Sequence, residues 1–317
     1  LRGYTGDFFV LLFQAFSIYL FVNNNPNFLY ASWVLVLTIV TPIIGLSNMS
    51  MDSIVATENS DEKINSYLLL RFRNLFFFFP IVVAINLFYQ SNASPWFLLI
   101  LAYLLKSFEG LSIAFRGIYY RDKAISKANL SKAISKFGYV IGFGYFLQEL
   151  NSLSFALLII LGWNMLVFII YDLIYLKNWN LFNLVNIFNF SNHFKLNKKF
   201  FLLGLNSFMQ LIVISIPQIL IERYLSLEIL SFVGIVMLFN SALDTVYLSS
   251  INSLRKSYSD LINKPAQLNQ FINKLSLFFL IYLCFLILSF YFFGDILFNF
   301  YDQYFSFRSD VMIIVLL

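Results

Sequence analysis

Residues 215–231 read SIPQILIERYLSLEILS and place Glu222 and Arg223 side by side between two long apolar runs. Those runs cover about 199–221 and 228–250, so each is long enough for a helix that crosses the ~30 Å hydrocarbon core of a bilayer. Two such runs joined by a short charged turn predict a pair of transmembrane helices. The charges then lie at the membrane edge, where they cost little, and we expect a structural or gating role for them rather than a catalytic one.

The composition extends this interpretation to the whole chain. Of 317 residues, 60% are apolar and 12% are charged, whereas a soluble globular protein carries about 25% charged residues. Backbone groups in hydrocarbon must be satisfied within their own segment, so each long apolar run predicts a helix. The predicted fold class is an all-α, polytopic membrane protein. We expect ten spans, at 7–23, 28–50, 67–89, 95–117, 134–150, 153–176, 199–221, 228–250, 274–293 and 309 onward.

The basic residues alternate between connections. NNNPN, QSNASP and ELNSL contain no Lys or Arg, whereas the connections between them are basic. Of 21 Lys and Arg, those outside the basic connections and the N-terminus are Arg223, Arg308 and Lys106, which lies within a span. By the positive-inside rule, the N-terminus and the basic connections are cytoplasmic, and residues 222–228 lie outside.

One basic connection has a helical pattern of its own. RDKAISKANLSKAISKFG, residues 121–138, places Lys123, Lys127, Lys132 and Lys136 near one helix face. This pattern predicts an interfacial helix that leads into the fifth span. The lysines either attract anionic lipid head groups or simply mark the cytoplasmic side.

Charged residues inside spans are candidate functional groups because they are costly in hydrocarbon. In LAYLLKSFEGLSIAFRG, residues 101–117, Lys106 and Glu109 are three apart and can pair on one helix face, with Arg116 two turns below. The strip either lines a hydrophilic cavity, or it is a neutralised pair between helices with Arg116 reaching the membrane edge. Arg71 and Asp172 lie near span ends, where interfacial anchoring is favoured.

Later spans carry further polar groups. Asn240 and Asp244 share a helix face in MLFNSALDTVYLSS, and a lone intramembrane carboxylate there either binds a proton or sodium ion or pairs with a basic residue. Span seven contains Gln210, and its Pro217 removes a backbone donor and permits a kink.

Other chemistries are poorly supported. A single Cys284 and a single His193 exclude a disulfide framework and make a metal site unexpected. The sequence has no Gly-rich phosphate loop and no paired carboxylates on an outside loop, so we predict neither an enzyme nor a bound cofactor. The net charge of +5 reports topology and contact with membrane lipids, and we infer no nucleic-acid partner from it.

Residues 197–262 resemble the start of the second helical lobe of bacterial polysaccharide flippases, within the multidrug/oligosaccharidyl-lipid/polysaccharide exporter superfamily. The matching positions are Ile216, Pro217, Ile221, Glu222, Tyr224, Glu228 and Leu230, whereas Ser226 and Ser231 replace glycines that are usual in the family. NPNFLYASWVLVLTIVTPIIGLS (25–47) and LKSFEGLSIAFRGIYYRDKAISKANLSKAISKFG (105–138) resemble earlier spans of the same family.

The resemblance implies two helical lobes with about ten of twelve or more helices present. These are a six-helix lobe at 1–177, a cytoplasmic linker at 178–198 and the start of a second lobe at 199–317. Leu1 and the terminal apolar run VMIIVLL lead us to expect a piece of a longer protein. The sequences of 25–35 and 226–236 are weakly similar and lie six spans apart, which fits two parallel repeats.

The implied activity is transport in the bacterial cytoplasmic (inner) membrane. The resemblance implies that the chain flips an undecaprenyl-diphosphate-linked oligosaccharide, of O-antigen or capsule type, to the outer leaflet by alternating access, with polysaccharide assembly proteins as possible partners. The implied site residues are the cavity cations Lys106, Arg116 and Arg71, the ion-coupling or polar residues Asp244, Glu109, Asn240 and Gln210, and the kink at Pro217. The alternatives are a drug/cation antiporter of the same superfamily and a membrane enzyme of glycan assembly.

Overall fold

The computed structural model describes residues 27–58, 60–88, 96–122, 124–150, 152–173 and 190–227, with scattered residues at 9–21, 229–237 and 266–284. The chain divides into two compact units, Leu1–Lys256 and Ser257–Leu317. The described residues of the second unit, between 266 and 284, are helical. All elements discussed below belong to the first unit. The division into lobes at 178–198 stays a prediction.

The regular structure of the described residues is entirely helical, which confirms the all-α fold class. Ile125–Leu150 is one uninterrupted helical run, and Leu153–Leu173 is a second; both include a π-helical turn, a rare feature that is frequent at functional sites. The elements are α2 (Asn27–Asn48), α3 (Met51–Thr57), α4 (Asp61–Phe88), α5 (Trp96–Arg121), α6 (Ile125–Ile141), η1 (Gly142–Phe146), α7 (Leu147–Leu150), α8 (Leu153–Val167), η2 (Phe168–Leu173) and α9 (Phe190–Tyr224).

Five helices among the described residues are long and apolar enough to cross a membrane, which fits a multi-pass membrane protein. They are Leu29–Thr57, Asp61–Ile85, Phe97–Arg121, Leu153–Leu173 and Lys198–Tyr224. They match the second, third, fourth, sixth and seventh predicted spans. The predicted span 134–150 is helical but shares its helix with three lysines, at 127, 132 and 136. The spans predicted at 7–23, 228–250, 274–293 and 309 onward lie wholly or partly outside the described residues, so the total of ten stays a prediction.

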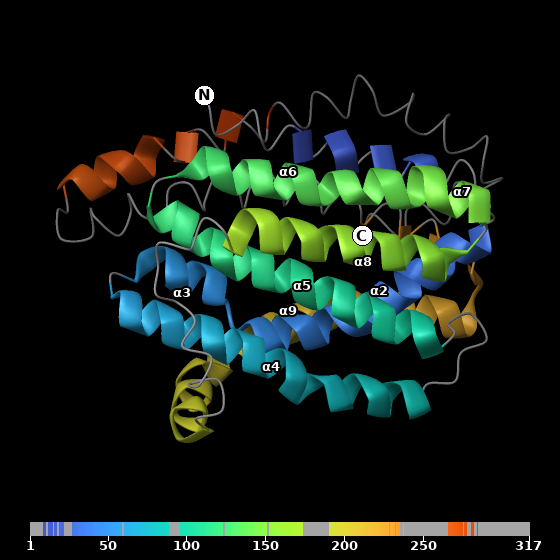
Figure 1. The fold of residues 1–317 in the computed structure, drawn as a ribbon, viewed down its shortest axis with the longest axis horizontal. Helices are drawn as coiled ribbons and strands as arrows, with labels where there is room; N and C mark the ends of the chain where they lie inside the picture. Colours follow the sequence, from blue (N-terminus) through green and yellow to red (C-terminus); the bar gives the residue numbers. More distant parts are fainter. Residues whose placement is uncertain are drawn as a thin grey trace. The chain divides into compact units, whose positions relative to one another are not determined.

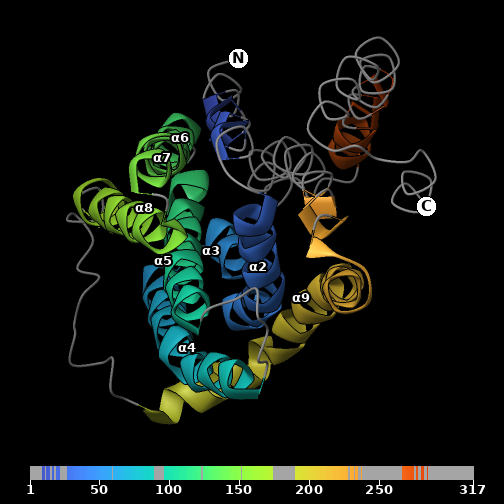
Figure 2. The same cartoon turned by 90° about the vertical axis from the view of Figure 1, so that its right-hand side faces the viewer.

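Helix α5 lies at the centre of the first unit, in contact with α2, α3, α4, α6 and α8. Figure 1 shows α5, α6 and α8 running side by side, and the view in Figure 2 places α2 between α5 and α9. A helix with neighbours on most sides encloses its polar residues as well as its apolar ones. The charged residues of the predicted fourth span therefore lie against other helices.

Two glycines mark very close approaches between helices. A side chain at Gly117 of α5 would lie 2.8 Å from the backbone oxygen of Asp52 in α3, and one at Gly204 of α9 would lie 2.7 Å from the backbone oxygen of Leu46 in α2. Glycine leaves room for these backbones to approach. Such small residues are enriched at helix interfaces in membranes, where packing rather than the hydrophobic effect drives association.

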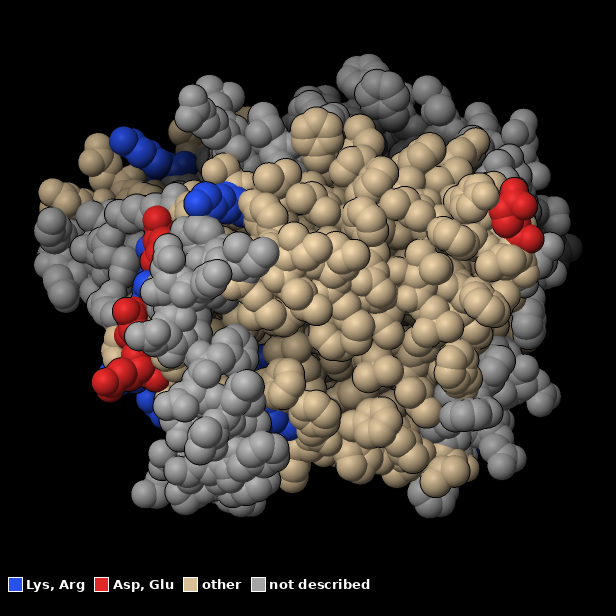
Figure 3. Space-filling model, in the orientation of Figure 1, with Lys and Arg blue, Asp and Glu red and all other residues tan. Residues whose placement is uncertain are grey.

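The outer surface of the first unit is apolar over a wide area. Large apolar side chains stand out from the bundle, for example Phe76 at 67% exposed, Leu87 at 69% and Ile169 at 57%. Figure 3 shows a broad, mostly uncharged face over α4, α5, α6 and α8, with most charges toward one end and an acidic group at the other. A surface of this kind fits contact with lipid tails.

Two of the predicted cytoplasmic connections meet at one end of the bundle. Arg121, at the end of α5, forms ion pairs with Asp61 at the start of α4, at 2.7 Å, and with Asp122, at 3.0 Å. The contact places both connections at the same end, as the alternation of basic residues requires. Which side of the membrane that end faces stays a prediction.

The stretch 215–231 attaches α9 to α2 through a buried hydrogen bond. Gln218 follows Pro217 and is only 7% exposed, and the Thr38 hydroxyl of α2, which also contacts the Val34 carbonyl of its own helix at 2.8 Å, donates to Gln218 Oε1. Thr38 is also buried. This hydrogen bond joins two helices that lie 180 residues apart in the chain.

We predict that Thr38→Val loosens the attachment of α9 to α2. Hydrogen bonds between membrane helices contribute on average about 0.6 kcal/mol and at most about 1.7 kcal/mol, so we expect a loss of unfolding free energy within that range. The measurement is unfolding of the purified protein in mixed micelles. Thr41→Val is the matched control, because it removes a bond within the helix, from the Thr41 hydroxyl to the Leu37 carbonyl at 2.6 Å, of the same kind as the bond from Thr38 to Val34 that Thr38→Val also removes. If Thr38→Val and Gln218→Leu have strictly additive effects, the two side chains are not coupled.

Candidate functional site

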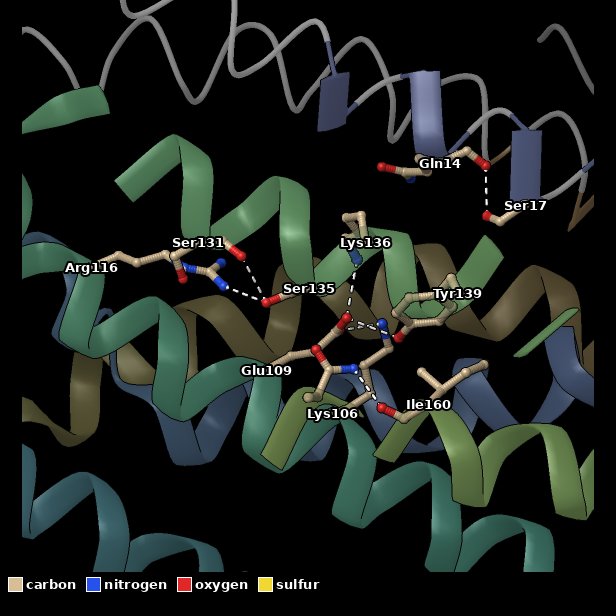
Figure 4. Close-up of polar contacts among 11 residues, drawn as sticks. Gln14, Ser17, Lys106, Glu109, Arg116, Ser131, Ser135, Lys136, Tyr139 and Ile160 are labelled. Atoms are coloured by element: carbon tan, nitrogen blue, oxygen red, sulfur yellow. Dashed lines mark hydrogen bonds and ion pairs between the residues drawn. The ribbon is translucent and has the colours of Figure 1, made fainter. Parts of the chain in front are cut away.

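Two lysines, a glutamate and a tyrosine meet between α5 and α6 (Figure 4); we call Lys106, Glu109, Lys136 and Tyr139 the Lys106 cluster. Lys106 Nζ lies 2.7 Å from Glu109 Oε2, and Lys136 Nζ lies 3.0 Å from Glu109 Oε1. The Tyr139 hydroxyl donates to the same Oε1 at 2.8 Å. One carboxylate thus holds two ammonium groups and a phenol.

The helical spacing of both segments builds this cluster. Lys106 and Glu109 are three residues apart on α5, and Lys136 and Tyr139 are three apart on α6, so each pair lies on one face of its helix. The Lys136 ammonium also lies 4.7 Å from the centroid of the Tyr139 ring, a cation–π distance. The facing sides of α5 and α6 are therefore both polar at this level.

The cluster carries one net positive charge at mid-span. Glu109 is the middle residue of the candidate span Phe97–Arg121. An unpaired charge at this depth costs roughly 2.5–3.5 kcal/mol on insertion scales, so such groups pair or face water. The Lys106 and Lys136 side chains are 24% and 27% exposed, whereas Glu109 is 13% exposed. The cations are thus more accessible than the acid between them, and an anion that reaches the cluster meets ammonium groups first.

The predicted pairing of Lys106 with Glu109 is confirmed, and Lys136 is the member that sequence reasoning missed. The sequence pattern predicts that Lys136 belongs to the interfacial lysine series, which either attracts lipid head groups or marks the cytoplasmic side. In the structure it lies on Glu109, and Lys132 lies over the ring of Tyr120 at 5.5 Å. The sequence does contain a signal for this contact. The spacing of Lys132, Lys136 and Tyr139 places all three along one face of the helix, so this face can be polar where it meets α5.

Arg116 belongs to a second network, formed with serines of α6 rather than with Glu109. Its Nε donates to Ser131 Oγ at 3.0 Å and its Nη2 donates to Ser135 Oγ at 3.1 Å (Figure 4). The Ser131 hydroxyl donates in turn to Asp172 Oδ1 at 2.8 Å. Arg116 is 6% exposed and Asp172 is fully buried, so both side chains are enclosed between helices, which the expectation of an interfacial anchor at Asp172 did not include.

Arg71 is enclosed between α2, α4 and α5. Its Nη1 donates to Ser47 Oγ at 2.6 Å, and its guanidinium fills the space beside Gly110, where a side chain would collide with it. The residue is 0% exposed, and its Nε and Nη2 have no hydrogen-bond partner. In this conformation the third predicted cavity cation is closed off from solvent, and its contacts do not include Lys106 or Arg116.

The remaining predicted site residues divide into two groups. Gln210 and Pro217 are exposed on α9, where Asn206 is exposed one turn before Gln210. Amide groups on the surface of an apolar helix require water or a protein partner, which fits a polar path along this face. The helix continues past Pro217 to Tyr224, and the kink stays a prediction. Asn240 and Asp244 lie outside the described residues.

Within the described part of the chain, no three His, Cys, Asp or Glu side chains gather as metal ligands. No family model, no curated protein and no solved structure matches the chain. A function for this protein therefore has to be argued from its own residues.

Proposed function

We propose that this chain is a transporter that moves a polyprenyl-diphosphate-linked oligosaccharide from the cytoplasmic to the outer leaflet of a bacterial inner membrane. The observation that carries the proposal is the Lys106 cluster, which holds an excess cation at mid-span in a helical bundle with an apolar outer surface. Intramembrane charges of this kind mark substrate and ion pathways. The resemblance of 197–262 to polysaccharide flippases supplies the identity of the cargo.

The proposed cargo has a charged part that fits the cationic Lys106 cluster and an apolar part that fits the outer surface of the bundle. A diphosphate carries its charge on oxygens that accept charge-assisted hydrogen bonds from ammonium and guanidinium groups. Lys106 and Lys136 offer such donors, and Arg116 lies two turns further along α5. The prenyl tail needs no protein cavity, because it can stay in lipid beside exposed side chains such as Phe76. The proposal includes a hydrated path between helices, along which the glycan follows the diphosphate.

The proposal includes two lobes that rock about a central path, with α9 as the first helix of the second lobe. The exposed amides of Asn206 and Gln210 give α9 a polar surface of the kind that path requires. A drug/cation antiporter is less well supported, because the acid at the cluster, Glu109, already has two cationic partners. No group among the described residues favours glycan-assembly chemistry over transport.

The test is depletion of the protein in cells, followed by leaflet-specific detection of the lipid-linked glycan. We expect the glycan to accumulate on the cytoplasmic leaflet and to be lost from the outer one. Re-expression of the full chain restores the distribution, and an unrelated multi-pass membrane protein does not. If the glycan reaches the outer leaflet at the normal rate after depletion, the proposal is wrong.

A further inference from the structure

The carboxylate of Asp172 is a buried charged group that the proposed substrate site leaves unused. It lies in η2, the π-helical end of the run that begins with α8, and it is 0% exposed. Its Oδ1 accepts hydrogen bonds from Ser131 at 2.8 Å and from the Tyr119 hydroxyl at 3.5 Å. Its Oδ2 has no hydrogen-bond partner. A charged oxygen in that situation is costly, and a bound proton removes the charge.

A single hydroxyl stands between this carboxylate and Arg116. Ser131 Oγ accepts from Arg116 Nε at 3.0 Å and donates its one proton to Asp172 Oδ1. Ser135 accepts from Arg116 Nη2 and donates to the Ser131 carbonyl at 2.9 Å. The network thus joins α5, α6 and η2, and the charge of Asp172 offsets that of Arg116 through the serine.

The surroundings of the carboxylate hold one charged partner among the described residues. The groups that act on it are Arg116, Tyr119 and Ser112 from α5 and Ser131 from α6. The α6 lysines have other contacts, since Lys132 lies over the Tyr120 ring and Lys136 lies on Glu109. A change of charge at Asp172 therefore acts mainly on the electrostatic interaction with Arg116.

We propose that Asp172 Oδ2 is a proton-binding site whose occupancy decides whether Arg116 is held on α6 or is released to bind an anion. A proton from water forms an O–H bond at Oδ2 and makes the carboxyl neutral. Arg116 then lacks the charge that offsets its own, and its guanidinium is free for a phosphate group. When the proton returns to water, the carboxylate draws Arg116 back through Ser131. The identity of the anion as a lipid diphosphate rests on the proposed function, whereas the proton site does not.

The first test needs no substrate. The full chain, purified in detergent, is treated with dicyclohexylcarbodiimide, which adds to protonated carboxyl groups in apolar surroundings, and the labelled residue is found by mass spectrometry. We expect label at Asp172 that increases as the pH falls and disappears in Asp172→Asn. Asp122→Asn is the matched control and keeps the label. Absence of label at every pH, label that does not change with pH, or protection by sodium but not by potassium overturns the proposal.

A second variant keeps the test valid if Asp172→Asn fails to fold. Ser131→Ala retains the carboxyl but removes a hydrogen bond to its charged form, so we expect more label than in the unmodified protein at neutral pH. Equal or weaker labelling in a folded Ser131→Ala variant contradicts the role of Ser131.

Translocation of the lipid-linked glycan in proteoliposomes separates this proposal from the proposed function. We expect Asp172→Asn to lose the pH dependence that the unmodified protein shows. An unchanged pH dependence in the variant overturns the control of Arg116 by Asp172 and leaves the flippase proposal intact. Label at Asp172 in a protein that moves no glycan supports the proton site and contradicts the flippase proposal.

Discussion

Glu109→Gln is expected to lower the free energy of unfolding more than removal of either lysine from the Lys106 cluster. The substitution leaves two ammonium groups side by side with no counter-ion, whereas loss of one lysine leaves a matched pair. Removing one partner from a fully buried ion pair costs about 3–5 kcal/mol, and the 24% and 27% exposure of the two lysines reduces this to about 2–3 kcal/mol. The measurement is unfolding of the purified protein in mixed micelles.

A double variant shows whether the lower free energy of unfolding comes from repulsion between the two lysines or from a loss of packing. In Glu109→Gln/Lys136→Met one of the two unpaired cations is gone, so we expect the double variant to be more stable than Glu109→Gln alone. Glu149→Gln changes an exposed carboxyl on α7 and is expected to have no effect. If the double variant is no more stable than Glu109→Gln, repulsion between the lysines is not the reason for the loss.

The sequence predicts the helices and the ion pair between Lys106 and Glu109, because both depend on residues close together in the chain. Apolar runs of suitable length located the five candidate spans, and the spacing of Lys106 and Glu109 is a property of α5 alone. Lys136 is different. It shares its pattern with Lys127, which is exposed, and only the packing of α6 on α5 decides which lysine meets Glu109.

Arg71 shows that position within a span does not decide whether a side chain is enclosed by protein. The predicted third span begins at 67, which places Arg71 near the membrane edge. Its burial comes from the packing of α4 on α2 and α5, where the guanidinium contacts Ser47 and Gly110. Asp172 is a similar case. Its burial depends on Ser131 and Tyr119, which the sequence alone does not bring to it.

Removing the lysines of the Lys106 cluster is expected to give the largest loss of glycan translocation. A hydrogen bond to a charged group contributes about 1.5–3 kcal/mol, so loss of one donor to the diphosphate corresponds to roughly a tenfold to hundredfold loss of rate. We expect losses of this size in Lys106→Met and Lys136→Met. In both variants Glu109 keeps a cationic partner, so the fold should be retained. The measurement is initial-rate translocation of the lipid-linked glycan in proteoliposomes.

The triple variant Lys106→Met/Glu109→Gln/Lys136→Met removes every charge from the cluster at once. Replacing a buried ionic group by uncharged residues of similar volume is often neutral or stabilising, so this protein should fold at least as well as the unmodified one. We expect it to move no glycan above background. Lys198→Met removes an exposed lysine of α9 and serves as the control for loss of positive charge. A folded triple variant that moves glycan at the unmodified rate would mean that the substrate's phosphates bind elsewhere, because no cation of the cluster would remain to hold them.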